Sequence, residues 1–359
     1  MHCSPGCLKL EDMTRPRTCI RELFHFALLI EIFALGNNFT WAADTAAPLA
    51  VEIKEYALPT ENALPHDPAV GPDGSLWFTE QKANKIGRLN PATGRIDEFP
   101  LRTPDSGPHG LVVDKQGNVW FTANSKGYIG KLNPASGEVA EHALKDARAT
   151  DPHTPVFDAK GILWFTVQQG NLIGRLDPAS GEVRLKEVPT AHARPYGIVI
   201  GKDAAPYFCE FGTNKLGRVD PVTLEIKEYS LPSGARPRRI ALASDGTLFY
   251  SDFARGMLGH FFPQDGRVEE WASPGGSGSQ PYGIAITGDG GVWYSESGVS
   301  PNTLVRFDAQ TRRFAKAPIP SGGGVVRHMV ATSQGRLYLA CSGVNRVAIA
   351  IPGQQHAER

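Results

Sequence analysis

An aromatic residue that follows a turn recurs every 42 to 45 residues along most of this chain. Seven residues occupy the position: Trp77, Trp120, Trp164, Tyr207, Phe249, Trp293 and Tyr338. A regular period of this length indicates a protein assembled from repeated structural units. The sequence therefore predicts seven copies of one unit.

Each copy contains short runs of β-branched and aromatic residues separated by turn residues. In the second copy these runs cover 111–113, 119–122, 128–132 and 138–141, with turns at 114–117 and 133–137. No segment repeats apolar residues at i, i+3, i+4 and i+7, which argues against helical repeats. Four strands per copy at this period are typical of a β-propeller blade, so we expect an all-β, seven-bladed β-propeller.

The ends of the propeller are also predicted. The last copy supplies three strands before the chain nearly ends, and residues 51–58 closely resemble the fourth-strand segment 224–231. We expect this N-terminal strand to complete the last blade and so to pair two otherwise open edges. The predicted divisions are a leader over 1–43, a linker over 44–50, the propeller over 51–351 and a tail over 352–359.

The leader has the pattern of an export signal. Arg15, Arg17 and Arg21 precede an apolar stretch at 24–35, and the small residue Ala42 follows. The stretch is too short for a stable transmembrane helix. We expect an exported protein, periplasmic or extracellular, with no membrane span after removal of the signal. The alternative is an irregular extension or an upstream start codon.

The charge and the cysteines exclude some partners and cross-links. The 37 basic and 37 acidic residues balance, which argues against a nucleic-acid partner. Outside the leader, which holds Cys3, Cys7 and Cys19, only Cys209 and Cys341 remain, in copies four and seven. Blades so far apart cannot bring two Cβ atoms to the roughly 4 Å of a disulfide. We expect two buried, non-catalytic thiols. We also expect a monomer, and the sequence does not identify any protein partner.

The candidate site comes from one pair of positions in each repeat. The two residues are fourteen apart across the first hairpin and are expected to face each other at the mouth of the central channel. The pairs are His66 with Glu80, His109 with Ala123, His153 with Val167, Tyr196 with Glu210, Arg238 with Asp252, Tyr282 with Glu296, and Arg327 with Cys341. Such variation at one position favours a polar site on a constant scaffold, although a solvated mouth would also tolerate any polar residue.

The three histidines suggest a catalytic group. Sheets about 10 Å apart would place alternate members of a seven-membered ring roughly 18 Å apart, which disfavours one metal ion bound by His66, His109 and His153 together. His109 and His153 remain candidate bases, with Asp151 as the supporting carboxylate or as the ligand of one ion. The alternative is that Asp151 is only a turn residue before Pro152.

The remaining mouth residues are candidates for holding a small-molecule ligand. They are His66, Tyr196, Arg238, Tyr282, Glu296 and Arg327. We expect Arg238 to form a structural ion pair with Asp252. Arg327 faces no acid in its own blade and is therefore the expected contact for an anion.

Several motifs resemble those of the streptogramin B lyase (virginiamycin B lyase) family. They are Pro-His-Gly-Leu at 108–111, Leu-Trp-Phe-Thr-Glu at 76–80, Asn-Lys-Ile-Gly-Arg-Leu at 84–89 and Gly-Arg-Ile-Asp-Glu-Phe at 94–99, and the resemblance covers 51–351. It implies a carbon–oxygen lyase that opens a cyclic depsipeptide antibiotic by Mg²⁺-dependent elimination, with a channel-mouth histidine as base. The acids offered for the metal here are Asp151, Glu80 and Glu210.

The family places its catalytic histidine in the last blade, in a Glu-Pro-His-Gly segment, and a second histidine one blade earlier. This sequence has Val-Val-Arg-His at 325–328 and Tyr282 in the preceding blade. The nearest equivalent is Asp-Pro-His at 151–153 with His109, displaced around the ring. Two hypotheses follow: a metal-assisted lyase for a cyclic or lactone-type small molecule, or a non-catalytic propeller that binds a small molecule or peptide.

Overall fold

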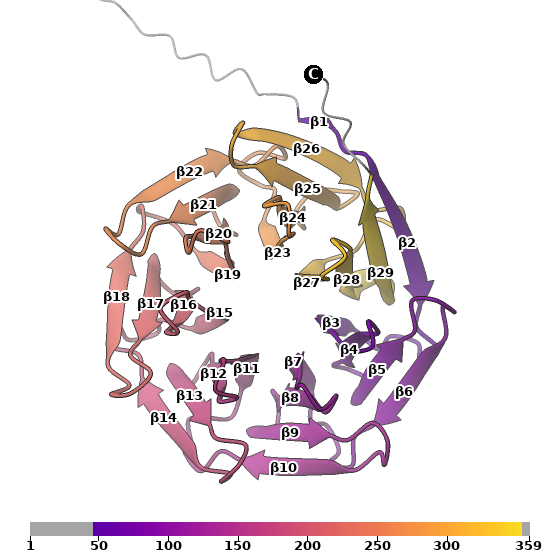
Figure 1. Ribbon diagram of the computed structural model, residues 1–359, viewed down its shortest axis with the longest axis vertical. Coiled ribbons are helices and arrows are strands. Elements are labelled where there is room, and N and C mark those ends of the chain that lie inside the picture. The colour runs from indigo at the N-terminus through magenta and orange to yellow at the C-terminus, as the bar shows by residue number, and fades with distance from the viewer. Residues whose placement is uncertain (1–45, 354–359) are drawn as a thin grey trace, which may run out of the picture. The chain divides into compact units, whose positions relative to one another are not determined.

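The computed structural model describes residues 46–353, which form one β-propeller of seven blades (Figure 1). The predicted leader and most of the predicted tail lie outside the described residues. In the described part the helical element is one 3-10 turn, η1 (Ser342–Val344). None of these residues form a helix long and apolar enough to cross a membrane.

In the first six blades the strands run outward from the centre in chain order, and in the seventh blade the outermost strand comes from the N-terminal end of the chain. The innermost strands are β3 (Pro65–Val70), β7 (Pro108–Val113), β11 (Pro152–Phe157), β15 (Pro195–Ile200), β19 (Pro237–Leu242), β23 (Pro281–Ile286) and β27 (Val326–Ala331). The second strands are β4 (Leu76–Glu80), β8 (Val119–Ala123), β12 (Leu163–Val167), β16 (Pro206–Glu210), β20 (Leu248–Asp252), β24 (Val292–Glu296) and β28 (Leu337–Cys341).

The third strands are β5 (Lys85–Leu89), β9 (Tyr128–Leu132), β13 (Leu172–Leu176), β17 (Lys215–Val219), β21 (Met257–Phe261), β25 (Thr303–Asp308) and β29 (Arg346–Pro352). The outer strands are β6 (Ile96–Pro100), β10 (Val139–Ala143), β14 (Val183–Glu187), β18 (Ile226–Ser230), β22 (Val268–Ala272), β26 (Arg313–Pro318) and β2 (Val51–Ala57). Seven blades of four antiparallel strands confirm the predicted fold class.

The N-terminal strand closes the ring, as the sequence predicted. β2 pairs antiparallel with β29 of the last blade from Val51 opposite Pro352 to Ala57 opposite Arg346. A second closure was not predicted, because the short strand β1 (Ala47–Pro48) lies inside the expected linker. It pairs in parallel with β26 of the sixth blade. The N-terminal segment thus joins the sixth and seventh blades.

The apolar core lies between neighbouring blades. One cluster contains Trp77 of the first blade together with Leu111 and Phe121 of the second. In the first five blades the third strand carries glycine where the aromatic ring of the second strand lies against it: a Cβ on Gly130 would be 2.1 Å from Phe121 Cζ. This close approach explains the repeated Ile-Gly-Arg-Leu type of motif. Cys209 and Cys341 are buried and unpaired, as expected.

Candidate functional site

A bulge near the start of each inner strand turns its second residue toward the central channel. In the first blade Pro65 is opposite Glu80 and Pro68 is opposite Phe78, so the inner strand has one residue more than its partner. The extra residue breaks the alternation on which the predicted pair of His66 and Glu80 depended. The expectation that these two residues face each other across the hairpin is therefore wrong.

The second residues of the inner strands gather at the centre of the ring. The ring centroids of His66 and His109 lie 3.7 Å apart, and those of His109 and His153 lie 3.8 Å apart. Tyr196 continues the stack, 4.0 Å from His153. The exposed fractions of the three histidines are 2%, 5% and 2%. The predicted wide separation does not apply to the imidazoles, because the side chains project inward from their strands.

A second layer of polar residues lies one position further along the inner strands. Arg239 Nη2 donates a 2.6 Å hydrogen bond to Asp67 Oδ1, and Arg239 Nη1 donates one of 3.2 Å to Thr154 Oγ1. His66 Nδ1 is 2.9 Å from the same oxygen of Asp67. The Arg239 guanidinium thus links the first, third and fifth blades, no two of which are adjacent.

Sequence reasoning missed this second layer, although a pattern was available. The residues at this position around the ring are Asp67, Gly110, Thr154, Gly197, Arg239, Gly283 and His328. Polar side chains alternate with glycines over most of the ring. The glycines permit close packing of inner strands, since a Cβ on Gly110 would lie 2.2 Å from the carbonyl oxygen of His153.

The electrostatics of the channel leave an excess of positive charge. Burial lowers the pKa of His66 to about 4 and the pKa values of His109 and His153 well below the ordinary 6.5, so the three imidazoles are neutral at pH 7. Burial alone would raise the pKa of Asp67, but the Arg239 guanidinium holds it well below its usual range. One carboxylate therefore stands among Arg238, Arg239 and Arg327, the channel arginines, which carry positive charge.

Arg238 does not form the predicted ion pair. Its guanidinium carbon lies 3.7 Å from the ring centre of Tyr282, 4.3 Å from that of Phe253 and 4.9 Å from that of Phe211. Asp252 instead accepts hydrogen bonds from the backbone N–H of Arg236 and from Arg255 Nε, at 2.9 and 2.5 Å. Rings on several sides stabilise the cation without neutralising it.

The tyrosines predicted to hold a ligand contact each other. The Tyr196 and Tyr282 hydroxyl oxygens lie 2.5 Å apart, and Arg238 Nη2 is 3.4 Å from the Tyr196 hydroxyl. Tyr196 is 3% exposed and Tyr282 is fully buried. Because the two hydroxyls are buried and bonded to each other, they are not available for ligand contact.

An open cavity of about 500 Å³ lies at the mouth over blades three to five. Its lining includes Gln169, His192, Arg194, Phe211, Arg236 and Phe253. Phe211 and Phe253 also surround Arg238, so the two rings lie between this partly buried cation and the cavity. The sequence analysis predicted Arg238 as a ligand contact, but it predicted none of the residues that line the cavity. The available pattern was that Phe211 and Phe253 each stand one residue after the second strand of their blade.

The two arginines of the cavity keep their charge available. Arg194 Nη2 donates to the side-chain carbonyl oxygen of Gln169 at 3.2 Å, and Arg236 Nη1 donates to the backbone carbonyl of Gly212. Both acceptors are neutral. The cavity therefore combines two aromatic rings with two exposed cationic heads, which suits an anion with an apolar part.

Comparison with known proteins places the chain in a family. A family model described as the virginiamycin B lyase family matches residues 46–298, well over half of the sequence. This chain belongs to the virginiamycin B lyase family. The matched part ends within the sixth blade, so the seventh blade, where the resemblance implies the family's catalytic histidine, lies beyond it.

Solved structures agree with this assignment. A virginiamycin B lyase from Staphylococcus aureus is 25% identical, with a TM-score of 0.77 over 84% of this chain and 99% of that one. A streptogramin B lyase is 26% identical, with a TM-score of 0.78 over 85% and 98%. A hydrazine synthase from Kuenenia stuttgartiensis, 14% identical with a TM-score of 0.70 over 83% and 97%, shares the fold alone.

The acids proposed from the virginiamycin B lyase resemblance do not line the channel. Glu80 is buried beside Lys85 and Glu98, and Glu210 accepts a 2.8 Å hydrogen bond from Thr213 Oγ1. Glu296 accepts hydrogen bonds of 2.5 Å from both Ser273 Oγ and Thr303 Oγ1. Partners outside the channel hold the Glu210 and Glu296 carboxylates, so a substrate contact for Glu296 is not supported.

Asp151 also serves a local role. Its carboxylate accepts hydrogen bonds from the backbone N–H groups of Gln169 and Gly170, at 2.7 and 3.3 Å. His153 Nδ1 is instead 2.9 Å from Thr154 Oγ1. The predicted support of His153 by Asp151 is therefore replaced by support from a hydroxyl, and the alternative of a turn residue describes Asp151 better.

The residues present do not suit Mg²⁺, the ion that the virginiamycin B lyase resemblance implies. Among the described residues the histidine, cysteine and acidic side chains that converge are His66, Asp67 and His109, with ligand atoms within 4.8 Å of one another. Two imidazoles and a carboxylate already bonded to Arg239 are a poor match for an ion that prefers six oxygens. Asp151, Glu80 and Glu210 do not form such a group.

Proposed function

We propose that this protein is a binding propeller whose mouth cavity holds an anionic small molecule with an apolar or aromatic part. The observation that carries the proposal is the position of Phe211 and Phe253 between the partly buried Arg238 and the cavity lined by Arg194 and Arg236. A ligand here would lie on the rings and place its anion near the guanidinium groups. Arg327, whose Nε is buried without a hydrogen-bond partner in the described part, adds positive charge to the channel.

The proposal includes export and a monomeric state. Residues 15–42 carry the basic, apolar and small segments of an export signal, and they lie outside the described residues. The ligand is thus a small molecule met in the periplasm or outside the cell. The family supports a cyclic depsipeptide or another lactone-type compound as the first candidate, together with its ring-opened carboxylate.

Calorimetric titration tests the binding proposal. We would titrate the protein with a streptogramin B and with its linear carboxylate form, and expect saturable binding that is tighter for the carboxylate. Arg236→Gln and Phe253→Ala should each weaken binding about tenfold or more, because they remove a charge and a ring from the cavity. Arg95→Gln is the matched control, because the Arg95 side chain is on the first blade and is 76% exposed. Equal affinity of all variants would reject this cavity.

The second candidate function is a carbon–oxygen lyase, favoured by membership of the family and by one orphaned atom. His109 Nδ1 is buried without a hydrogen-bond partner among the described residues, and its neutral imidazole can accept a proton. In the elimination, a base takes a proton from carbon, the neighbouring C–O bond breaks, an alkene forms and the ester oxygen leaves as a carboxylate. The channel arginines would stabilise the developing negative charge.

Chromatography with mass detection separates the two candidates. Incubation with a streptogramin B or a lactone, with Mg²⁺ or with a chelator, would yield a linear isomer of unchanged mass from a lyase. Hydrolysis would give a product heavier by one water. If the lyase operates, His109→Ala and His153→Ala should each remove turnover while the fold is retained. Loss of turnover with His328→Ala alone would show that neither His109 nor His153 is the base. Absence of turnover by the wild-type protein would leave binding as the activity.

A further inference from the structure

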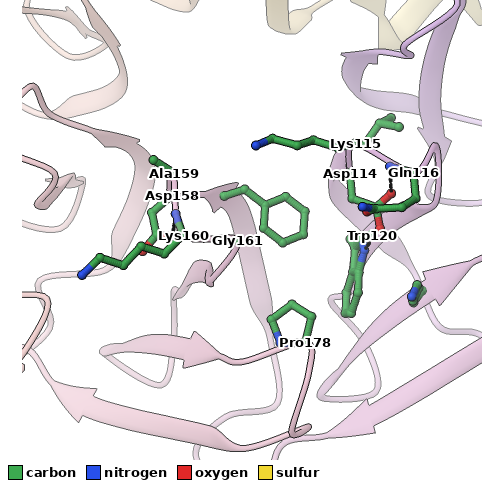
Figure 2. A pocket seen from close by; sticks show the side chains of 12 residues that line it. Asp114, Lys115, Gln116, Trp120, Asp158, Ala159, Lys160, Gly161 and Pro178 are labelled. Carbon is green, nitrogen blue, oxygen red and sulfur yellow. Dashed lines mark hydrogen bonds between the residues drawn. The ribbon is translucent and has the colours of Figure 1, made fainter.

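A second cavity, of about 600 Å³, lies between the second and third blades at the far end of their inner strands. It is lined by the turns after β7 and β11 together with Trp120, Phe157, Lys131 and Pro178. Figure 2 shows Trp120 and Pro178 at its wall, with Lys115 extending from the Asp114 turn toward Ala159. The inner strands separate this cavity from the mouth, since their first residues lie at the mouth and their last residues border these turns.

The turns at this cavity lack an ion pair that three other blades have. In blades one, four and six the third turn residue is an aspartate that pairs with an arginine of the third strand: Asp73 with Arg88, Asp203 with Arg218, and Asp289 with Arg306. Blades two and three have Gln116 and Lys160 at this turn position. The ion pair that lies beside the second-strand ring in blades one, four and six is therefore missing at this cavity.

The carboxylates of these two turns are directed inward instead. Asp114 Oδ2 accepts a 2.9 Å hydrogen bond from Trp120 Nε1, and Asp158 Oδ2 accepts one of 3.0 Å from Trp164 Nε1. Both acids also accept hydrogen bonds from backbone N–H groups of their own turns. Their acceptor oxygens are thus committed to the protein.

The lysines at this cavity remain available. Lys131 Nζ lies 5.2 Å from the ring centre of Trp120, and no carboxylate of the described residues lies within 4.0 Å of the ammonium groups of Lys115, Lys131 or Lys160. Three ammonium groups and two carboxylates leave one net positive charge beside the opening.

The apolar part of the cavity is particular to this blade pair. Phe157 ends β11 at a position where the other blades carry smaller residues: Val70, Val113, Ile200, Leu242, Ile286 and Ala331. It is partly exposed and meets Trp120 edge to face, with centroids 5.9 Å apart and planes at 88°. A flat ring can therefore contact Phe157 and Pro178 while its substituent reaches Lys115.

We propose that this inter-blade cavity is a second binding site, which takes a planar aromatic molecule carrying one carboxylate. The aromatic and proline side chains supply apolar contact, Lys115 and Lys131 supply the cationic partner, and the volume falls in the range of small-molecule pockets. The site is independent of the mouth cavity, because the two share no lining residue.

Titration of the full chain with 2-naphthoate at low salt tests this proposal, with 2-naphthalenemethanol as the uncharged probe. Lys115→Gln should weaken naphthoate binding about three- to tenfold and leave the alcohol unaffected. Phe157→Val, which introduces the residue of the first two blades, should weaken binding of both probes. Lys202→Gln changes a lysine at the same turn position as Lys115 in the fourth blade and should have no effect.

The outcomes separate this site from the mouth. Binding that Arg236→Gln weakens, while Lys115→Gln and Phe157→Val leave it unchanged, would assign naphthoate to the mouth and overturn the proposal. Absence of saturable binding at millimolar naphthoate would overturn it as well. Circular dichroism of each variant confirms that the fold is kept, and Lys115 is exposed, so its substitution does not disturb the core.

Discussion

Arg239 and Asp67 lie 172 residues apart in the chain and form a buried ion pair inside the ring, with Arg239 Nη2 2.6 Å from Asp67 Oδ1. Their side chains are 1% and 2% exposed. The contact joins the fifth blade to the first across the channel. It therefore fixes the relative positions of the inner strands β19 and β3, whose blades are not adjacent in the ring.

Asp67→Asn should strongly destabilise the protein. The substitution leaves the Arg239 charge buried without its partner, which typically costs about 3–5 kcal/mol. Urea unfolding at pH 7 measures the loss. Arg88→Gln, which removes the exposed ion pair with Asp73, is the control and should cost less than about 1 kcal/mol. An Asp67→Asn loss as small as that of the control would show that the buried pair does not hold the ring together.

Glu80 should make stability depend on pH. Burial, with a smaller contribution from Glu98, raises its pKa from 4.5 to about 8 in the folded protein. Between these values the folded state binds more protons than the unfolded chain, so the free energy of unfolding falls as the pH rises from 4.5 to 8. Glu80→Gln should reduce this slope, measured by urea unfolding across the window.

Glu210 provides the comparison for this pH effect. Burial raises its pKa to about 7, so the contribution of Glu210 to the slope should end near pH 7. Glu210→Gln should accordingly change the stability profile below pH 7 and leave the part between 7 and 8 to Glu80. Identical profiles for wild type and Glu80→Gln would mean that Glu80 titrates at its ordinary value in the folded protein.

Gly110→Ala should destabilise the contact between the second and third blades. The new Cβ would lie 2.2 Å from the carbonyl oxygen of His153 and 2.4 Å from Pro155 Cδ, and neither a backbone carbonyl nor a rigid proline ring can move aside cheaply. Such overpacking typically costs about 1–3 kcal/mol. Gly278→Ala is the control, since a Cβ added there would meet open space, with no neighbouring side chain or backbone within 4 Å. Equal melting temperatures for the two variants in thermal unfolding would contradict the expectation.

Hydroxyl groups of the second strands connect neighbouring blades. Thr122 Oγ1 donates a 2.8 Å hydrogen bond to the His153 carbonyl and accepts one of 2.9 Å from the backbone N–H of Gly110. Thr79, Thr166, Ser251 and Ser295 donate to the next inner strand in the same way. These contacts fix the inner strands whose side chains fill the channel.

Thr122→Val should therefore cost about 1–3 kcal/mol, because it leaves a buried carbonyl and a buried N–H without their partner. Thr122→Ser retains the hydroxyl and should recover most of the stability. Urea unfolding of the pair isolates the hydrogen bonds from the change in volume. A serine variant no more stable than the valine variant would assign the effect to the lost methyl group.

Much of the fold could be predicted because it follows from local patterns. The recurrence of Trp77, Trp120 and their equivalents determined the number of blades, and alternation of apolar runs with turns determined four strands in each. The likeness of 51–58 to 224–231 identified the closing strand. The pairing of β1 with the sixth blade was missed, since two residues carry no pattern.

The site was predicted only in part. Sequence alone placed His66, His109 and His153 at equivalent positions, and equivalence in a closed ring brings them toward one axis. It could not show the bulge that places Pro65 and Pro281, rather than His66 and Tyr282, opposite Glu80 and Glu296, because a bulge depends on the pairing of two strands rather than on either strand.

The tertiary structure alone decided which side chains meet. Arg238 lies among Tyr282, Phe253 and Phe211 rather than beside Asp252, and Arg239 reaches Asp67 rather than a residue of its own blade. Sequence specifies each blade through contacts between near neighbours in the chain. The channel is formed by residues that are far apart in sequence and close only after the ring has closed, so their partners depend on the side-chain geometry of all seven blades together.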